Sequence, residues 1–293
     1  MSSKIKSGLL NIDKPQGLTS YDVVDVLKKV FCNTKIGHTG TLDPIATGVL
    51  QICIGDATKL TNLLSNQEKR YYVKMLLGVE TDTYDITGRI IFAGVVKKDE
   101  IYIKERIKRF IGKQLQIPPI YSAIRIDGKR AYEYARENKE VEISPKEIEI
   151  YSIDNIKVDL VKKEVLFEVY CSKGTYIRSL INDIGKKIGC GATMIELRRL
   201  SNGSFNIKDS IKLYDFLKLD FDKMQEKIVS IEDYYNNTKK IELTEEELKH
   251  FLNGVNLNYD EQDKLVRVYC NKIFIGLGKI EDCKLKRDII VNS

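Results

Sequence analysis

Residues 146–188 read KEIEIYSIDNIKVDLVKKEVLFEVYCSKGTYIRSLINDIGKKI and hold a hairpin followed by a helix. The stretches 146–159 and 164–171 are rich in Ile, Val, Leu, Phe and Tyr, which predicts two strands with a turn at Lys162-Lys163 between them. The pattern then predicts a helix that Gly174 opens, because apolar residues recur there every three or four positions. Its expected buried side consists of Ile177, Leu180, Ile181, Ile184 and Ile188. A hairpin that leads into a helix is typical of an α+β domain built on a largely antiparallel sheet.

The N-terminal third continues this mixed pattern. Residues 8–13 predict a short buried strand, closed by the turn Lys14-Pro15-Gln16-Gly17. Thr19 and Ser20 are expected to cap a helix whose apolar face extends to Phe31. The stretch Ile36–Thr47 has no helical period and contains two glycines and a proline, so a loop is expected there. A strand over Gly48–Ile54 follows.

Between this region and the hairpin, strands are expected at Tyr71–Leu77 and Arg89–Val95. A helix is expected from about Lys98, with Gly112 as its stop. The whole pattern favours the α+β class.

The C-terminal part has a different organisation. After Ser201 the pattern breaks up, and a polar run at Asn236–Lys240 marks a boundary. Beyond it the sequence predicts a small β-rich module with an acidic helix, Glu245–Leu252, and strands at Leu265–Cys270 and Lys272–Leu277. We therefore predict a main domain over residues 1–235 and a small module over residues 236–293.

Composition excludes several classes of protein. The 293 residues are 43% hydrophobic and 31% charged, which argues against disorder, and the formal net charge is +6. No stretch approaches the length of a membrane span and no signal sequence is evident, so a soluble cytoplasmic protein is expected. The six cysteines form no C-x-x-C pair and there are only two histidines. We expect no metal and no cofactor.

Positive charge concentrates in residues 101–136. This stretch holds nine basic residues (Lys104, Arg106, Lys108, Arg109, Lys113, Arg125, Lys129, Arg130 and Arg136) against three acids (Glu105, Asp127 and Glu133). Tyr121, Tyr132 and Tyr134 lie among them. Cations neutralise phosphates and aromatic rings stack on bases, so the pattern indicates a nucleic-acid surface. A solvated helix face with scattered tyrosines explains it equally well.

The glycine-rich stretch Gly37–Pro44 reads GHTGTLDP. It lacks the spacing of a nucleotide phosphate-binding loop. Pro44 biases Asp43 toward an extended backbone, so Asp43 is a candidate catalytic carboxylate, although an Asp before Pro more often starts a turn. His38 could stack on a base or orient a carboxylate, or could be an ordinary loop histidine.

Arg178 is expected in the first turn of the helix after Gly174. The helix dipole disfavours a cation there, which indicates an anionic partner, either a carboxylate or a phosphate, although a surface ion pair explains the placement as well. The run Leu197-Arg198-Arg199-Leu200 could clamp RNA or could alternate between core and solvent in a strand.

Taken together, these blocks resemble the TruB family of tRNA pseudouridine-55 synthases. The matching strings follow one another in family order: LLNIDKPQG (9–17), GHTGTLDPIATGVL (37–50), GDATKL (55–60), KRYYV (69–73), TDTYD (81–85), IPPIYSAIRIDGKRAYEYAR (117–136), CSKGTYIRSLINDIG (171–185) and CGATMIELRRL (190–200). They are distributed over residues 8–205. The resemblance implies a pseudouridine-synthase fold with an active-site cleft, and isomerisation of one uridine in the T-loop of tRNA.

The resemblance also implies roles for individual residues. Asp43 matches the catalytic aspartate, Tyr71 the tyrosine that stacks on the target base, and His38 a residue that contacts the flipped-out loop. Further matches are Tyr176, Arg178 and Leu197 in the pocket and the basic residues Lys14 and Lys59 near it. Residues 117–136 match an insertion that closes over RNA, which includes Lys129 and Arg130, and residues 236–293 are similar to a PUA-like RNA-binding module.

This chemistry needs no cofactor, only an ionised carboxylate, a stacking wall and an extruded base. On this hypothesis Asp43 is the nucleophile, kept ionised by Arg178, and Tyr71 stacks on the base while its hydroxyl helps to remove the C5 proton. The basic segment favours the stand-alone bacterial form, which acts on the tRNA T stem-loop without an obligate protein partner. Nothing in the sequence indicates an oligomer, so a monomer is the default expectation. Two alternatives are a guide-RNA-dependent synthase subunit and a non-catalytic tRNA-folding chaperone.

Overall fold

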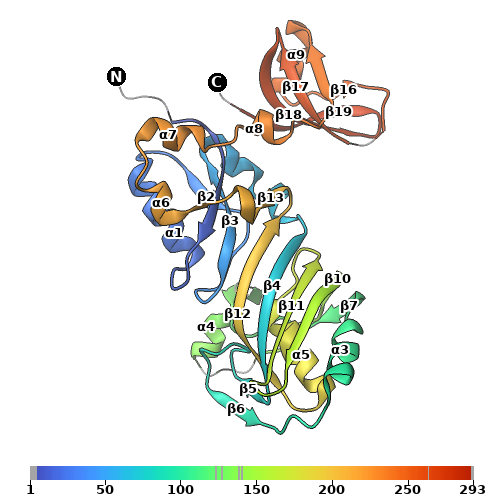
Figure 1. Cartoon of the computed structure of the whole chain (residues 1–293). Helices are drawn as coiled ribbons and strands as arrows, with labels where there is room; N and C mark the ends of the chain where they lie inside the picture. Colours follow the sequence, from blue (N-terminus) through green and yellow to red (C-terminus); the bar gives the residue numbers. More distant parts are fainter. Residues whose placement is uncertain are drawn as a thin grey trace. The chain divides into compact units, whose positions relative to one another are not determined.

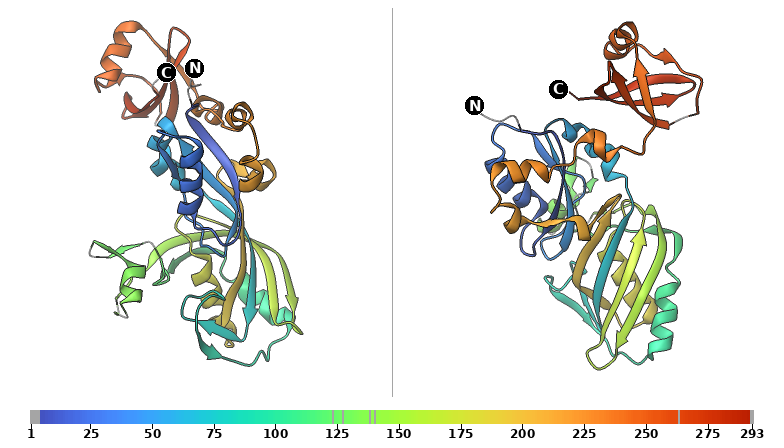
Figure 2. Two further views of the ribbon diagram at one scale, coloured as in Figure 1. Left: turned by 90° about the vertical axis from the view of Figure 1, so that its left-hand side faces the viewer. Right: turned by 45° about the horizontal axis from the view of Figure 1, so that its top comes forward.

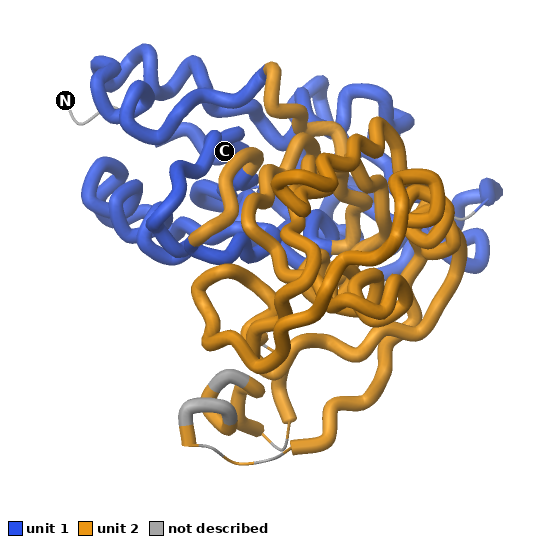
Figure 3. Tube along the Cα trace, turned by 60° about the horizontal axis from the view of Figure 1, so that its bottom comes forward, with its two compact units in different colours: residues 1–44, 50–65, 209–293 blue, residues 45–49, 66–208 orange. Residues whose placement is uncertain are grey.

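The computed structural model describes residues 5–122, 124–126, 128–137, 139, 141–262 and 264–291. The chain divides into two compact units (Figure 3). Unit 1 comprises residues 1–44, 50–65 and 209–293, and unit 2 comprises residues 45–49 and 66–208. The strand β3 (Thr47–Ile54) contributes residues to both.

Five strands of unit 2 run antiparallel to their neighbours and belong to a larger mixed sheet. These strands lie in the order β12-β4-β11-β10-β7 (Figure 1). They are β12 (Ala192–Asn202), β4 (Lys69–Leu77), β11 (Glu164–Cys171), β10 (Lys146–Asp159) and β7 (Gly112–Gln116). The helix α5 (Ile177–Ile188) packs against β12 and α3 (Glu100–Lys108) against β10. The expected α+β class with a largely antiparallel sheet is confirmed.

The strand β4 shows how sequence alternation places side chains. Its odd-numbered residues from Lys69 to Leu77 are buried and its even-numbered residues are half-buried. In the antiparallel register with β12, Tyr71 lies opposite Arg199 and Val73 opposite Leu197. Directly opposite residues share a face, so these four side chains line the same side of the sheet.

The basic segment 101–136 is divided among several elements. Its first part forms α3, in which Ile103 and Ile107 are fully buried, and its middle part forms β7 at the sheet edge. The remainder leaves the sheet as the hairpin β8 (Arg125–Ile126) and β9 (Lys129–Arg130) with α4 (Ala131–Arg136), which projects away from the sheet (Figure 2). Asp127 and the side chains of Tyr132 and Arg136 lie outside the described residues. A second hairpin pairs β5 (Val79–Thr81) with β6 (Ile90–Ala93), and β13 (Phe205–Asn206) pairs antiparallel with the end of β12.

Unit 1 begins with β1 (Gly8–Lys14) and α1 (Ser20–Val30), as expected. The hydroxyl of Thr19 accepts from the backbone of Asp22, and the Asp22 carboxylate accepts from the backbone of Thr19. This reciprocal cap begins the helix. Around β1 lie β14 (Ile211–Lys212), the unit-1 half of β3, and β2 (Ile36–His38).

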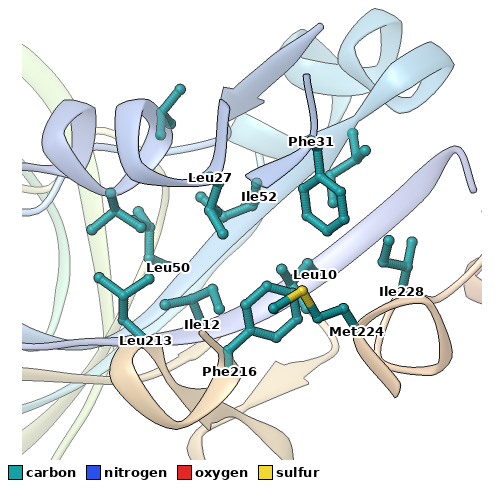
Figure 4. Close-up of a cluster of buried hydrophobic side chains, with 13 residues drawn as sticks. Leu10, Ile12, Leu27, Phe31, Leu50, Ile52, Leu213, Phe216, Met224 and Ile228 are labelled. Carbon is teal, nitrogen blue, oxygen red and sulfur yellow. The ribbon is translucent and has the colours of Figure 1, made fainter. Parts of the chain in front are cut away.

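Short helices complete this part: η1 (Gly55–Leu60), α2 (Thr61–Ser65), α6 (Leu213–Phe216), α7 (Phe221–Glu226) and α8 (Ile231–Tyr234). The short helix η2 (Ile207–Asp209) lies where the chain passes from unit 2 to unit 1. The apolar core combines side chains from early and late in the chain (Figure 4). Leu10, Leu27 and Phe31 pack with Phe216 and Met224.

The last part of unit 1 is β-rich. Its strands lie in the order β15-β17-β18-β19-β16 and are β15 (Lys240–Leu243), β17 (Lys264–Cys270), β18 (Ile273–Glu281), β19 (Lys284–Ile290) and β16 (Leu257–Asn258). The helix α9 (Glu245–Leu252) supplies Phe251 to their core. The expected small β-rich C-terminal module is confirmed.

Three local predictions are wrong. Ile36–His38 is a strand, because its backbone pairs with residues 52–54 of β3. The helix α3 ends at Lys108 rather than Gly112, which has φ +112° and begins β7. Gly174 has φ +76° and lies in a turn, so α5 begins only at Ile177.

Candidate active site

Asp43 lies half-buried in the loop between β2 and β3. Each neighbour of Asp43 is anchored by the backbone or side chain of another segment of unit 1. The hydroxyl of Ser20 donates to the carbonyl of Leu42 (3.2 Å) and accepts from its N–H (2.8 Å), and the N–H of Gly17 donates to the carbonyl of Pro44 (2.8 Å). Because both adjacent residues are held, the backbone at Asp43 is fixed in place.

Lys14 braces the turn that anchors this loop. It is fully buried, and its ammonium donates to the carbonyls of Pro15 (2.9 Å) and Leu18 (2.6 Å). A charged donor ties the first residues of the turn to the start of α1. The sequence-based role of Lys14 as an RNA contact stays a prediction; these two hydrogen bonds are to the protein backbone.

Tyr71 lies on the buried side of β4, beside two cations. It is 8% exposed, and its side chain is hydrogen-bonded to the guanidinium of Arg199, which also donates through Nε to the carbonyl of Val49 (2.6 Å). Burial lowers the pKa of Arg199, and the interaction with Tyr71 opposes that shift. Since a guanidinium only donates, the Tyr71 oxygen accepts this bond.

Lys69 is the second buried cation on this side of the sheet. Burial, together with the charge of Arg199, lowers the pKa of its ammonium to about 8. The ammonium donates to the carbonyl of Gln67 (2.6 Å). Two buried cations therefore lie near the Tyr71 side chain.

Leu197 is 5% exposed and lies opposite Val73, on the same face as Tyr71. Of the two arginines that follow it, Arg198 is half-buried and donates to the Thr47 hydroxyl (3.2 Å), whereas Arg199 is buried. The run 197–200 thus alternates between core and partly exposed positions, as one of the two interpretations predicted. One of the two core residues of the run is an arginine, Arg199, which was not among the candidate site residues.

Arg178 occupies the first turn of α5, as expected, and its anionic partner is Asp85. The guanidinium Nη1 lies 3.7 Å from Oδ2 of Asp85, and the side chains are 8% and 7% exposed. Nη1 also donates to the carbonyl of Thr83 (3.1 Å) and Nη2 to that of Tyr121 (2.9 Å). The other Asp85 oxygen accepts from the hydroxyl of Thr83 (3.1 Å) and from the backbone and hydroxyl of Thr87.

Tyr176 is the N-cap residue of α5 and makes no side-chain cap bond. Its backbone is held instead by Gln116: the Tyr176 N–H donates to Oε1 (2.8 Å), and Nε2 donates to the Tyr176 carbonyl (3.1 Å). Neither Gln116 nor Asp85 is predicted as a site residue from the sequence, although Asp85 lies in the TDTYD string. Their roles depend on partners far along the chain.

The other basic site candidates lie on three different elements, β2, η1 and β9. His38 ends β2 and is half-buried. Lys59 pairs with Asp56 (2.6 Å) and donates to the Ile290 carbonyl (2.8 Å), both within unit 1. Lys129 and Arg130 are exposed on β9, where Lys129 lies 3.6 Å from Glu137 and 5.9 Å from the Tyr134 ring centre.

Unit 2 therefore carries Tyr71 and Leu197 on one sheet face and Tyr176 and Arg178 at the start of α5, while unit 1 carries the Asp43 loop with His38, Lys14 and Lys59. Among the described residues, no group of three or more His, Cys, Asp or Glu side chains is placed to hold a metal ion. Over the same residues, no helix is both long and apolar enough to cross a membrane.

Comparison with known proteins identifies similar chains. The family "TruB family pseudouridylate synthase (N terminal domain)" matches residues 28–177, "tRNA pseudouridylate synthase B C-terminal domain" matches 178–256, and "Pseudouridine synthase II TruB, C-terminal" matches 240–286. The chain is 43% identical over 287 residues to tRNA pseudouridine synthase B of Clostridium kluyveri, which covers 95% of this chain and 97% of that protein. The corresponding protein of Thermosipho melanesiensis is 41% identical over 283 residues, covering 94% and 91%.

A solved structure is also similar. A chain in the crystal structure of a Cbf5-Nop10-Gar1 complex matches with a TM-score of 0.70 and 27% identity, covering 97% of this chain and 84% of that chain.

Proposed function

Because the chain belongs to the TruB family of pseudouridylate synthases, we propose that it is an isomerase that converts a uridine of tRNA to pseudouridine. The observation that carries the proposal is the 43% identity, over almost the whole of both chains, to a tRNA pseudouridine synthase B. We propose more specifically that the target nucleotide is the T-loop uridine at position 55 of tRNA. The tRNA T stem-loop would then be the substrate.

The reaction breaks the bond from N1 to C1′ and forms a bond from C1′ to C5. The C5 proton leaves and N1 gains a proton, so no atom or electron is supplied from outside. Asp43 acts on the ribose, either as a nucleophile at C1′ or by assisting glycal formation. Its fixed backbone supports this role, because a positioned carboxylate loses little freedom on reaction.

Tyr71 stacks on the extruded base, and its hydroxyl helps to remove the C5 proton. Leu197 and Tyr176 form apolar walls of the pocket, and Arg178 keeps the catalytic carboxylate ionised. The pairing of Arg178 with Asp43 stays a prediction. Extruding the base costs a few kcal/mol of stacking, which the new contacts offset.

His38, Lys14, Lys59, Lys129 and Arg130 complete the proposed RNA-contacting set, Lys14 through the turn it braces. We further propose a cytoplasmic monomer with no obligate protein partner, a catalytic domain over 1–235 and a PUA-like RNA-binding module over 236–293. Guide-RNA dependence is the second candidate, since a similar structure is that of Cbf5 in a complex with Nop10 and Gar1. Activity of the purified chain without guide RNA or other proteins would exclude it.

The test is tritium release from 5-[³H]uridine-labelled tRNA transcript, with wild type beside Asp43→Asn and without metal or cofactor. Release by wild type alone supports both the reaction and Asp43 as its centre. Release by both variants keeps the reaction and removes the nucleophile assignment. Binding without release by wild type would instead favour the folding-chaperone alternative.

A further inference from the structure

The first turn of α5 is tied to one continuous segment, residues 116–121, which leads from the edge of the sheet toward the basic hairpin. Four hydrogen bonds make the connection. Gln116 makes two of them with the backbone of Tyr176, the Ser179 hydroxyl donates to the Ile117 carbonyl (2.8 Å), and Arg178 donates to the Tyr121 carbonyl (2.9 Å). Both pocket candidates at this end of α5 are therefore attached to residues 116–121.

The position of Gln116 allows its side chain to hold the backbone at the start of α5. It is the last residue of β7, is 3% exposed, and pairs through its backbone with Lys146. Its side-chain amide presents one donor and one acceptor to the N–H and carbonyl of a single residue, as a neighbouring strand would. Tyr176 has no side-chain cap of its own, so Gln116 fixes the point at which α5 begins.

The same segment continues into the hairpin that carries Lys129 and Arg130. From the clamp at Gln116, the chain reaches the Arg178 contact at Tyr121 and then, a few residues later, the exposed cations of β9. A displacement of the hairpin on contact with phosphates would therefore act on the hydrogen bonds that place Tyr176 and Arg178.

We propose that Gln116 is a positioning residue that couples RNA contact at the basic hairpin to the placement of Tyr176 and Arg178. The inference rests on the proposed function, since it assigns a role within the same reaction. It predicts that Gln116 controls the rate of the bound complex and contributes little to RNA affinity.

The chain offers a matched control in Gln114. It lies two residues earlier on the same strand and is half-buried, and its Nε2 donates locally to the Phe110 carbonyl (2.6 Å). Single-turnover tritium release at saturating tRNA would be measured for Gln116→Met and Gln114→Met, together with Kd for tRNA and Tm. We expect Gln116→Met to lower the saturating rate about 10–100-fold, because small misplacements of catalytic groups have effects of that size. The Kd of Gln116→Met for tRNA should stay within about threefold of wild type. The saturating rate and the Kd of Gln114→Met should both be near those of wild type.

A second variant keeps the inference testable if Gln116→Met folds poorly. In Gln116→Glu, the protonated carboxyl would accept from the Tyr176 N–H and donate to its carbonyl, as the amide does, whereas the ionised carboxylate would repel that carbonyl. Burial raises the pKa of such a carboxyl. The rate of Gln116→Glu relative to wild type should therefore rise as the pH falls from about 8 to about 6. A flat ratio would overturn the clamp.

The coupling itself is tested by combining Gln116→Met with Lys129→Gln/Arg130→Gln. The double charge change should lower the saturating rate in the wild-type background and have little further effect in Gln116→Met. If the double charge change lowers the saturating rate by the same factor in Gln116→Met as in wild type, the proposed coupling is wrong. If wild type releases no tritium at all, the proposed function fails instead, so the two failures are distinguishable.

Discussion

Arg178 and Asp85 form an ion pair inside unit 2, with 3.7 Å between Nη1 and Oδ2 and less than a tenth of each side chain exposed. The sequence places Arg178 where the helix dipole opposes its charge, and Asp85 supplies the compensating carboxylate. Asp85 is held in turn by Thr83 and Thr87. The position of the Arg178 side chain thus depends on a loop nearly a hundred residues earlier in the chain.

Removing Asp85 should therefore destabilise the protein. We expect Asp85→Ala to lower the free energy of unfolding by about 3–5 kcal/mol, because it leaves a buried guanidinium without its carboxylate. Asp85→Asn should cost less and still reduce tritium release. Urea unfolding measures the first effect. The control is Glu100→Gln, which removes an exposed pair with Lys104 and should change stability by less than about 1 kcal/mol; equal losses in the two variants would contradict the argument.

Ser20 should matter for rate more than for stability. In Ser20→Ala, Leu42 loses a partner for both its N–H and its carbonyl, so the Asp43 loop is released on one side. The expected costs are about 1–3 kcal/mol of stability and about tenfold or more in the rate at saturating tRNA. Thr19→Ala, which removes the helix cap next to it, should cost about 0.5–2 kcal/mol and leave the rate unchanged. Similar rates for the two variants would show that Ser20 does not position Asp43.

The lowered pKa of Lys69 predicts that the stability of the protein depends on pH. Its folded-state pKa of about 8 is below the value of about 10.4 expected in the unfolded chain, so at pH 7 folding buries a charge. We expect Lys69→Met to raise the free energy of unfolding at pH 7 by about 1–2 kcal/mol, after the lost bond to Gln67 is subtracted. This gain should shrink as the pH rises from about 8 to about 10.5, because wild type then loses the proton in the folded state. Chemical denaturation of both proteins across this range is the measurement; a gain that grows with pH would contradict the sign.

The exposed cations of β9 should act through phosphate contacts. Changing Lys129 and Arg130 to Gln should weaken tRNA binding and reduce the slope of log Kd against log salt by about two. Lys162 and Lys163 are also adjacent and exposed, but lie in the turn between β10 and β11. The same change there should leave the slope as in wild type, and an unchanged slope in the β9 variant would remove the hairpin from RNA recognition.

Regular periodicity predicted the fold well. The strands 146–159 and 164–171 and the helix Glu245–Leu252 have the observed bounds, and in 164–171 buried and half-buried residues alternate to the end of the strand. The strand Ile36–His38 was not predicted, since three residues contain too short a pattern and only the pairing with β3 extends them. Glycines predicted turns correctly, but Gly112 does not end α3 and Gly174 does not begin α5.

The sequence predicted several residues of the candidate site, but it predicted only some of the groups that these residues contact. The charge of Arg178 in a helix N-terminus indicated an anion, and the structure identifies it as Asp85. Gln116 gave no signal, because a glutamine in an edge strand is unremarkable until its partner, 60 residues away, is known. Arg199 was visible in its run, but only the register with Tyr71 shows that it points into the core.

The core of unit 1 has a consequence for synthesis on the ribosome. Leu10, Val23 and Leu27 pack with Leu213, Phe216 and Met224, and the chain between Ser65 and Asp209 belongs to unit 2. At roughly 5–20 residues per second, about 140 intervening residues take about 7–30 s to translate. During that interval the apolar face of α1 lacks its late partners, while unit 2 has all of its strands by residue 208. Unit 2 is therefore expected to fold first, and the nascent N-terminal segment to be the part that most needs chaperone protection.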